Sequence, residues 1–304
     1  MILVLGDILL DKFLKNTYIK KSPEANIPIV RPNKIITRLG GAANLINNIN
    51  TVCKDCIIVS RIGIKTDDDE VLSLIKNKKI KYKFFKQKNY SVGRKSRFYI
   101  DNKQILRTDD EKIVKLNKLV ENQIIKFIKK KKKKFSMIVI SDYNKGIINK
   151  NLYKTITQFF LKDKKIIITN PKKKNLSFYN GSNIIVPNQK EFDQFFPEKE
   201  NFNSKIKKFF LNKNLKHLII TRGDKNLIHF KNKKKEIYKV KKVKTFDVTG
   251  ASDTFVAILA LSLFKKNKIE KCIKLAIMAA TRVVQKKFTS VISKKEFFKL
   301  NKNL

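Results

Sequence analysis

A short segment in the last third of the chain combines small residues with two carboxylates. It reads DVTGASD from Asp247 to Asp253 and leads directly into a long apolar stretch. If a helix begins at Gly250 or Ala251, its first N–H groups lack partners within the helix. Together with the helix dipole they attract an anion, above all a phosphate. Gly250, Ala251 and Ser252 are small enough for a phosphate to approach the backbone, so the segment predicts a phosphate site.

Asp253 would lie in the first turn of that helix, beside the bound anion. A carboxylate repels a phosphate, so its presence there calls for another role. As a general base it would accept the proton of a substrate hydroxyl that attacks a phosphoryl group, while the N–H donors stabilise the developing charge. The alternative is an ordinary acidic residue at a helix start, which contributes only about 0.3–1 kcal/mol. The segment alone leaves both interpretations open.

Two earlier segments place polar groups where a small ligand could bind. In RLGGAANLINNI, Gly40 and Gly41 would let the backbone approach a ligand, and Asn44 offers a donor and an acceptor to hydroxyl groups. A tight turn that enters a helix is the structural alternative. Asp7 follows the first apolar run, at the edge where open α/β sheets bind ligands.

Two later segments follow predicted strands in the same way. PNQKE carries Asn188 and Glu191, which suit a network of Mg²⁺ and water, although Asn188 could simply cap a helix. TRGDKN, which begins at Thr221, is a polar turn at another strand end. The pattern GxxxxGK[ST] is absent from the sequence, which excludes the usual P-loop.

The order of the elements predicts an α/β fold. Short apolar runs alternate with helical patterns, which is typical of a mostly parallel central sheet with helices on both faces. The predicted strands span residues 2–5, 57–60, 137–140, 166–169, 183–187 and 217–221. The last third is helical, with helices predicted at 251–265, at 269–285 and from 293 onward.

Two segments, residues 11–38 and 90–107, alternate apolar and polar residues without a helix between them. They predict a small antiparallel sheet that forms a lid over the active-site edge. We expect one domain over residues 1–304, of which these segments are the lid.

The net charge of +45 raises the alternative of a basic nucleic-acid-binding protein. Lysine, however, is spread along the whole chain, and it reads bases less well than arginine does. The apolar runs are too short to span a bilayer, and the N-terminus lacks the basic segment of a signal peptide. We therefore expect a cytoplasmic protein that binds neither a specific nucleic acid nor a membrane.

Taken in order, these segments resemble the ribokinase-like (PfkB) family of carbohydrate kinases over nearly the whole chain. The two hallmarks are the di-glycine segment, GGAAN here, and DTxGAGD, which is DVTGASD here. Within the family, SPEANIPIV, ILRTDDE, SDYNKGII and NPKKKNLSFYNGSNIIVPNQKEF resemble the kinases of D-glycero-β-D-manno-heptose 7-phosphate. Only the kinase domain of such an enzyme is expected in this chain.

The resemblance implies an activity and its cofactors. ATP would phosphorylate O1 of heptose 7-phosphate to the 1,7-bisphosphate, a step of ADP-heptose synthesis for lipopolysaccharide. Mg²⁺ would accompany ATP, with K⁺ as a further candidate ion, and the enzyme would be a homodimer joined through the lid. A kinase of the same family for ribose, fructose or a nucleoside is the nearest alternative, and a non-catalytic family member is a further one.

The resemblance also implies roles for particular residues. Asp253 would be the base, and the N–H groups of Gly250, Ala251, Ser252 and Asp253 would form the anion hole. The residues implied to bind the sugar phosphate are Asp7, Gly40, Gly41, Asn44, Lys95, Arg97, Arg107, Asp142, Tyr143 and Lys145. Those implied to bind the nucleotide are Asn170, Lys172, Asn188, Glu191, Thr221 and Gly223. Glu191 would in addition hold Mg²⁺ through water.

The sequence departs from the family pattern at several positions. Ser252 stands where the second glycine of GAGD is usual, and Asn170 replaces the aspartate of DPK. Phe288 stands where a glycine is usual, in a loop expected on the adenine side. Ser252 is the sharpest question, because a positive φ there would strain the anion hole and a helical φ would cost little.

Overall fold

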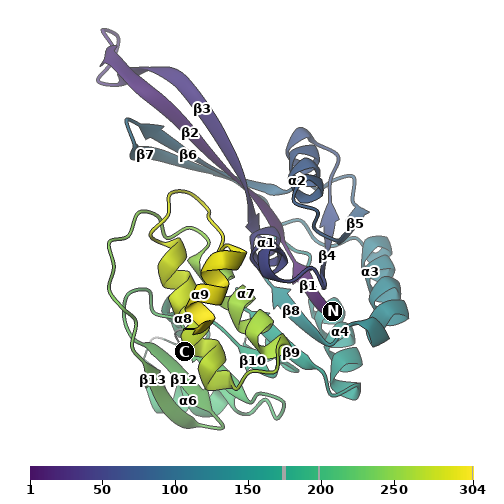
Figure 1. Cartoon of the computed structure of the whole chain (residues 1–304). Coiled ribbons are helices and arrows are strands. Elements are labelled where there is room, and N and C mark those ends of the chain that lie inside the picture. Colours follow the sequence, from purple (N-terminus) through teal and green to yellow (C-terminus); the bar gives the residue numbers. More distant parts are fainter. Residues whose placement is uncertain (173–175, 198, 303) are drawn as a thin grey trace.

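The computed structural model describes residues 1–172, 176–197, 199–302 and 304, and Figure 1 shows how their helices and strands are arranged. In this part of the chain the central sheet consists of β1 (Ile2–Gly6), β4 (Cys56–Ile62), β5 (Tyr82–Lys86), β8 (Met137–Ser141), β9 (Ile166–Asn170), β10 (Ile184–Ile185), β11 (His217–Ile220), β12 (Leu227–Lys231) and β13 (Lys234–Tyr238). The strand order is β13-β12-β11-β10-β9-β8-β1-β4-β5. Neighbouring strands from β5 to β11 are parallel, and β12 and β13 extend the β11 edge in antiparallel fashion.

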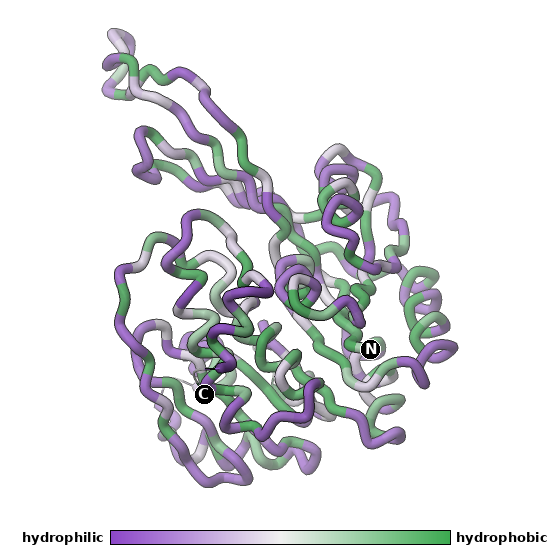
Figure 2. Tube along the Cα trace, viewed as in Figure 1, coloured by the Kyte–Doolittle hydropathy of each residue, from purple (hydrophilic) through white to green (hydrophobic). Residues whose placement is uncertain are grey.

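The inner strands of this sheet, from β4 to β11, are nearly continuous apolar runs and are buried on both faces. Successive side chains point to opposite faces, so Val4 and Val139 pack in one hydrophobic cluster while Leu3 and Ile138 pack in the other. Figure 2 shows green, hydrophobic stretches running through the body of the molecule. The sequence of the strands thus requires helices on both sides.

Helices supply that cover on each face. The first cluster includes side chains from α1 (Ala42–Val52), α2 (Thr66–Asn77), α7 (Ala251–Phe264), α8 (Ile269–Val283) and α9 (Lys294–Lys302). The second includes side chains from α3 (Lys118–Lys131), α4 (Lys150–Lys162), α5 (Gln189–Gln194) and α6 (Phe202–Phe209). Two short 3₁₀ segments, Lys132–Lys134 and Leu176–Tyr179, complete the helical elements of the described chain. No helix in the described ranges is long and apolar enough to cross a membrane.

A second sheet projects away from the body and is called the lid (Figure 1). It contains β2 (Ile8–Lys21), β3 (Pro28–Gly41), β6 (Gly93–Ile100) and β7 (Lys103–Asp110), in the order β3-β2-β6-β7. The chain leaves the body at Asp7, between β1 and β2, and returns at Gly41, directly before α1. Gly41 has a φ of 58°, and a Cβ there would lie 2.6 Å from the carbonyl oxygen of Asp7. This close crossing requires glycine and fixes the base of the lid against the body.

The predicted fold class is confirmed: the sheet is mostly parallel, helices cover both faces, and a second small sheet is present. The strands predicted at residues 2–5, 57–60, 137–140, 166–169 and 217–221 correspond to β1, β4, β8, β9 and β11, and the run at 183–187 is reduced to the two residues of β10. The lid corrects one expectation, since it is mixed rather than antiparallel. Strands β2 and β6 both enter the lid from the body, so they run outward side by side in the same direction.

Candidate active site

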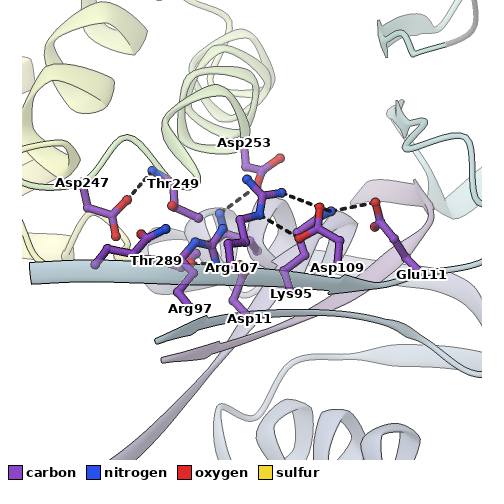
Figure 3. A network of polar contacts seen from close by, with 12 residues as sticks. Asp11, Lys95, Arg97, Arg107, Asp109, Glu111, Asp247, Thr249, Asp253 and Thr289 are labelled. Atoms are coloured by element: carbon purple, nitrogen blue, oxygen red, sulfur yellow. Dashed lines mark hydrogen bonds and ion pairs between the residues drawn. The ribbon is translucent and has the colours of Figure 1, made fainter. Parts of the chain in front are cut away.

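Most of the predicted site residues lie at one edge of the central sheet. Asp7 follows β1, Asp142 follows β8, Asn170 ends β9, Asn188 comes shortly after β10, and Thr221 follows β11. Because parallel strands end at the same edge, their carboxyl ends bring these residues together. The first turn of helix α7 lies at this edge and faces the lid (Figures 1 and 3).

The start of α7 is built as the DVTGASD segment predicts. Gly250 is the N-cap with a φ of 82°, and a Cβ there would lie 2.6 Å from Asn44 Nδ2. Ser252 lies inside α7 and is not among the described residues with positive φ, so a serine causes no backbone strain at this position. The Ala251 N–H donates to Val248 O at 3.2 Å. Of the predicted anion hole, this leaves the N–H groups of Gly250, Ser252 and Asp253.

Asp253 is the buried carboxylate of this site, with 3% of its surface exposed. Its Oδ1 accepts a hydrogen bond from the Tyr143 hydroxyl at 2.5 Å, and its Oδ2 accepts one from Asn44 Nδ2 at 2.8 Å. Burial raises the pKa of Asp253 to about 7; the two hydrogen bonds lower it and the charge of Asp11 raises it further. A carboxyl group with such a pKa exchanges its proton near neutral pH, as a general base must.

Asn44 and Asp253 are held in register by contacts between α1 and α7. Asn48, one turn after Asn44, donates from Nδ2 to the Asn44 carbonyl at 3.0 Å. The Thr254 hydroxyl donates to Asn48 Oδ1 at 3.2 Å. These buried polar pairs connect the di-glycine segment to the anion-hole segment, 209 residues apart at the Asn44–Asp253 contact.

Asp7, predicted to bind the sugar, has a carboxylate that is engaged by the backbone. It is 1% exposed, and its carboxylate accepts hydrogen bonds from the backbone N–H groups of Tyr143, Lys145 and Ile147 at 3.1, 3.0 and 3.2 Å. Asp7 thus holds the loop of residues 142–147, called the SDY loop below. Burial raises the pKa of Asp7 despite these three donors.

Asp11 is a site residue that the sequence analysis missed. It is 4% exposed, pairs with Arg97 Nη1 at 2.9 Å and accepts a hydrogen bond from the Thr289 hydroxyl at 2.9 Å. It lies at the base of the lid, and Figure 3 shows it on the lid face that points toward Asp253. The available signal was its place in an alternating segment, directly after the buried apolar residues that begin β2.

Five charged residues form a group that we call the lid cluster: Lys95, Arg107, Asp109, Glu111 and Lys145. Arg107 donates from Nε and Nη2 to the two oxygens of Asp109, both at 2.7 Å. Lys95 Nζ lies 3.2 Å from Asp109 and 2.8 Å from Glu111, which also pairs with Lys145 Nζ at 2.8 Å. Figure 3 shows Lys95, Arg107 and Asp109 of the lid, and Glu111 directly after β7, on the face toward Asp253.

Arg97, the third predicted lid cation, is outside this cluster. Its side chain is 7% exposed and is committed to Asp11. Three cations and two carboxylates therefore share the lid cluster, and Arg97 neutralises the buried Asp11 instead.

Three of the residues predicted to bind a nucleotide, Asn188, Thr221 and Gly223, line a cavity of about 270 Å³. It is lined by Asn188, Gln189, Lys190, Thr221, Arg222, Gly223 and Lys225. Asn188 and Thr221 are joined by an isolated parallel bridge. Gly223 has a φ of 64°, a left-handed conformation that glycine adopts readily, in the turn beside the cavity.

Glu191 has both carboxylate oxygens engaged. Oε2 accepts a hydrogen bond from Asn188 N–H at 2.9 Å, within a reciprocal capping box at the start of α5. Oε1 pairs with Lys172 Nζ at 2.8 Å. Because both oxygens already have partners, Glu191 is better placed to contact a metal ion through water than directly. Among the described residues, no group of three His, Cys, Asp or Glu side chains could hold a metal ion on its own.

Phe288, which stands where a glycine is usual, contacts the lid. Its ring packs against Phe13 and Tyr99 of the lid, with ring centres 4.8 and 6.0 Å apart. It also keeps the left-handed backbone that a glycine would adopt, with a φ of 64°. The aromatic side chain therefore joins the last loop to the lid.

The fold and this site define a sugar kinase of the ribokinase-like type, and the comparisons with known proteins agree. Residues 2–295 match the family described as pfkB family carbohydrate kinase. The chain belongs to this family, whose members are phosphotransferases that act on a sugar hydroxyl.

Individual relatives support the same assignment. The bifunctional protein HldE of Campylobacter jejuni (strain RM1221) is 33% identical over 291 residues, which cover 94% of this chain and 61% of the relative. This chain thus spans about three fifths of the length of that relative. Ribokinase from Thermotoga maritima has a TM-score of 0.75 at 19% identity, with 99% of each chain covered. Phosphofructokinase-2 from Escherichia coli in complex with potassium has a TM-score of 0.78 at 14% identity, with 99% of this chain and 98% of that chain covered. At these identities the two structures show the fold alone.

Proposed function

We propose that this protein transfers the γ-phosphoryl group of ATP to O1 of D-glycero-β-D-manno-heptose 7-phosphate. The observation that carries the proposal is a buried carboxylate, Asp253, in the first turn of α7, opposite a charged lid face. Asp253 accepts the O1 proton, O1 forms a bond to the γ-phosphorus, and the bond from that phosphorus to the bridging oxygen of ADP breaks. The N–H groups at the start of α7 stabilise the charge on the transferred group.

The choice of a phosphorylated heptose rests on the lid cluster and on the motifs. Lys95 and Lys145 are largely buried cations, with 15% and 16% of their side chains exposed, and Arg107 is 46% exposed. A guanidinium group matches two oxygens of a phosphate, and the ammonium groups add charge beside it. We infer that the 7-phosphate replaces Asp109 and Glu111 as the partner of these cations. The similarity to HldE over 94% of this chain and the segments ILRTDDE and SDYNKGII support the same choice.

Replacing Arg107 by alanine tests this part of the proposal. It removes the forked donor and leaves Asp109 with Lys95 alone, so the KM for a phosphorylated acceptor should rise about 10- to 100-fold. The KM for ATP should stay unchanged. Steady-state kinetics with heptose 7-phosphate and ATP give both constants, and Arg31→Ala, an exposed arginine on β3, is the matched control.

The outcome that contradicts the heptose proposal is equally concrete. If the wild type uses the sugar without its phosphate as efficiently as heptose 7-phosphate, the lid cluster does not select a phosphate. A panel with ribose, fructose 6-phosphate and a nucleoside would then identify the class of acceptor.

We assign one candidate place to each of two metal ions. Mg²⁺, when bound with ATP, offsets the charge of its phosphates, and Glu191 would hold it through water, with Asn188 beside it. For K⁺ we assign Asp247, whose Oδ2 is buried and has no hydrogen-bond partner within the described residues, while Oδ1 accepts from Thr249 N–H at 2.8 Å. The rate in K⁺ should exceed that in tetramethylammonium, and equal rates would contradict the assignment.

We propose further that two copies associate through their lids. The outer parts of the lid expose apolar side chains, namely Tyr18, Ile19, Ile27, Ile35, Ile105 and Leu106. A second lid would cover these side chains together with the open strand edges. Sedimentation equilibrium separates this dimer from a monomer. The proposed place of the reaction is the cytoplasm, in ADP-heptose synthesis for lipopolysaccharide.

A further inference from the structure

Tyr143 connects the candidate base to the rest of the SDY loop. We propose that Tyr143 is a positioning residue for Asp253: its hydroxyl orients the carboxylate and stabilises its charged form, and Asp7 holds Tyr143 in place. The inference rests on Asp253 being the general base, as proposed above. It does not depend on which sugar is the acceptor.

The first step is the geometry around the carboxylate. Each oxygen of Asp253 already accepts one hydrogen bond, from Tyr143 at 2.5 Å and from Asn44 at 2.8 Å. A carboxylate oxygen has two lone-pair sites, so each keeps one position for a further donor. Two donors from different elements fix the plane of the group, and the substrate hydroxyl can approach only along the remaining directions.

The second step is the rigidity of the loop that carries Tyr143. The backbone N–H groups of three alternate residues, Tyr143, Lys145 and Ile147, donate to the buried Asp7 carboxylate. Asn144 and Gly146, which lie between them, have φ angles of 55° and 107°. The alternating backbone points these three N–H groups inward around one anion, a concave arrangement that binds carboxylates well. Asp7 therefore sets the position of Tyr143, and through it that of Asp253.

The third step is electrostatic. Burial and the charge of Asp253 raise the pKa of Tyr143 well above its usual value, so its hydroxyl remains a donor over the working pH range. The other charged groups that face this pair are Asp11, which is paired with Arg97, and Glu191; Figure 3 shows Arg107 pointing toward Asp253. Burial and Asp11 both favour the protonated form of Asp253, and Tyr143 opposes them. Loss of the hydroxyl should leave the base protonated at neutral pH.

Tyr143→Phe tests the inference, because it removes only the hydroxyl. The acid limb of the kcat/KM profile should move upward by about one to two pH units, the worth of one hydrogen bond to a charged group. Activity at pH 7 should fall about tenfold or more and recover at higher pH, with an unchanged KM for ATP. Tyr99→Phe removes a lid hydroxyl that contacts Gln104 and is the matched control.

A second measurement does not require turnover. The carboxyl ¹³C signal of Asp253, assigned by its loss in Asp253→Asn, should titrate at a higher pH in Tyr143→Phe than in the wild type. An unshifted titration, or a loss of activity that is the same at every pH, would overturn the role of Tyr143. If Asp253→Asn instead turns over like the wild type, the assignment of Asp253 as the base fails, and the inference about Tyr143 fails with it.

Discussion

Asp253→Asn should lower kcat by about 10²- to 10⁴-fold, the contribution of a positioned general base. The amide keeps the size of the side chain and can still contact Tyr143 and Asn44, but it cannot accept the proton of the attacking hydroxyl. The KM values should change little, because the proton transfer belongs to the transition state. Steady-state turnover at pH 8, where the wild-type base is ionised, measures the effect.

Two controls make this result specific. Asp69→Asn replaces an exposed acid on α2 and should leave kcat at the wild-type value. Thermal unfolding should show that the Asp253→Asn protein is folded, with a Tm at least as high as that of the wild type because a buried charge is removed. Turnover by Asp253→Asn within a few-fold of the wild type would refute the general-base mechanism.

Gly250→Ala should have the next largest effect on the reaction. Gly250 has a φ of 82°, and the new Cβ would lie 2.6 Å from Asn44 Nδ2. The substitution therefore strains the backbone by about 1–2 kcal/mol and displaces Asn44 from Asp253. It also moves the N–H donors of the anion hole, and the loss of one such donor typically lowers kcat about 10²- to 10³-fold.

The control for Gly250→Ala is another glycine with a positive φ. Gly181 has a φ of 110°, and a Cβ there would lie 3.1 Å from Thr157 Oγ1, away from the site. Gly181→Ala should lower the Tm but keep kcat, whereas Gly250→Ala should lower both. Equal kcat values for the two variants would mean that the start of α7 does not stabilise the transition state.

The sequence was sufficient for the elements that carry their signal locally. The strands β1, β4, β8 and β9 are short continuous apolar runs between polar turns, and this pattern is typical of strands that are buried on both faces. The start of α7 was predictable because Gly250 and Asp253 lie within one short segment. In both cases the residues that form the sequence pattern are the same residues that form the structural element.

Other features depend on contacts that no local pattern encodes. Asp11 gains its place through Thr289, which is 278 residues away, and through Arg97 on a neighbouring strand. Asp7 follows a strand as ligand-binding residues do, yet its carboxylate is surrounded by N–H groups of the SDY loop. Spacing alone could not distinguish a side chain that faces the ligand from one that holds the loop beside it. The aromatic contact of Phe288 with the lid depends on tertiary packing in the same way.

The central claim is that O1 of heptose 7-phosphate receives the phosphoryl group, and ³¹P NMR of the product tests it most directly. With heptose 7-phosphate, ATP and Mg²⁺, the account predicts ADP and an equal amount of a new phosphate ester whose ³¹P signal couples to the anomeric proton. The existing 7-phosphate signal should persist. A new phosphate on any other carbon, or ATP consumption only with acceptors that lack a phosphate, would contradict the claim.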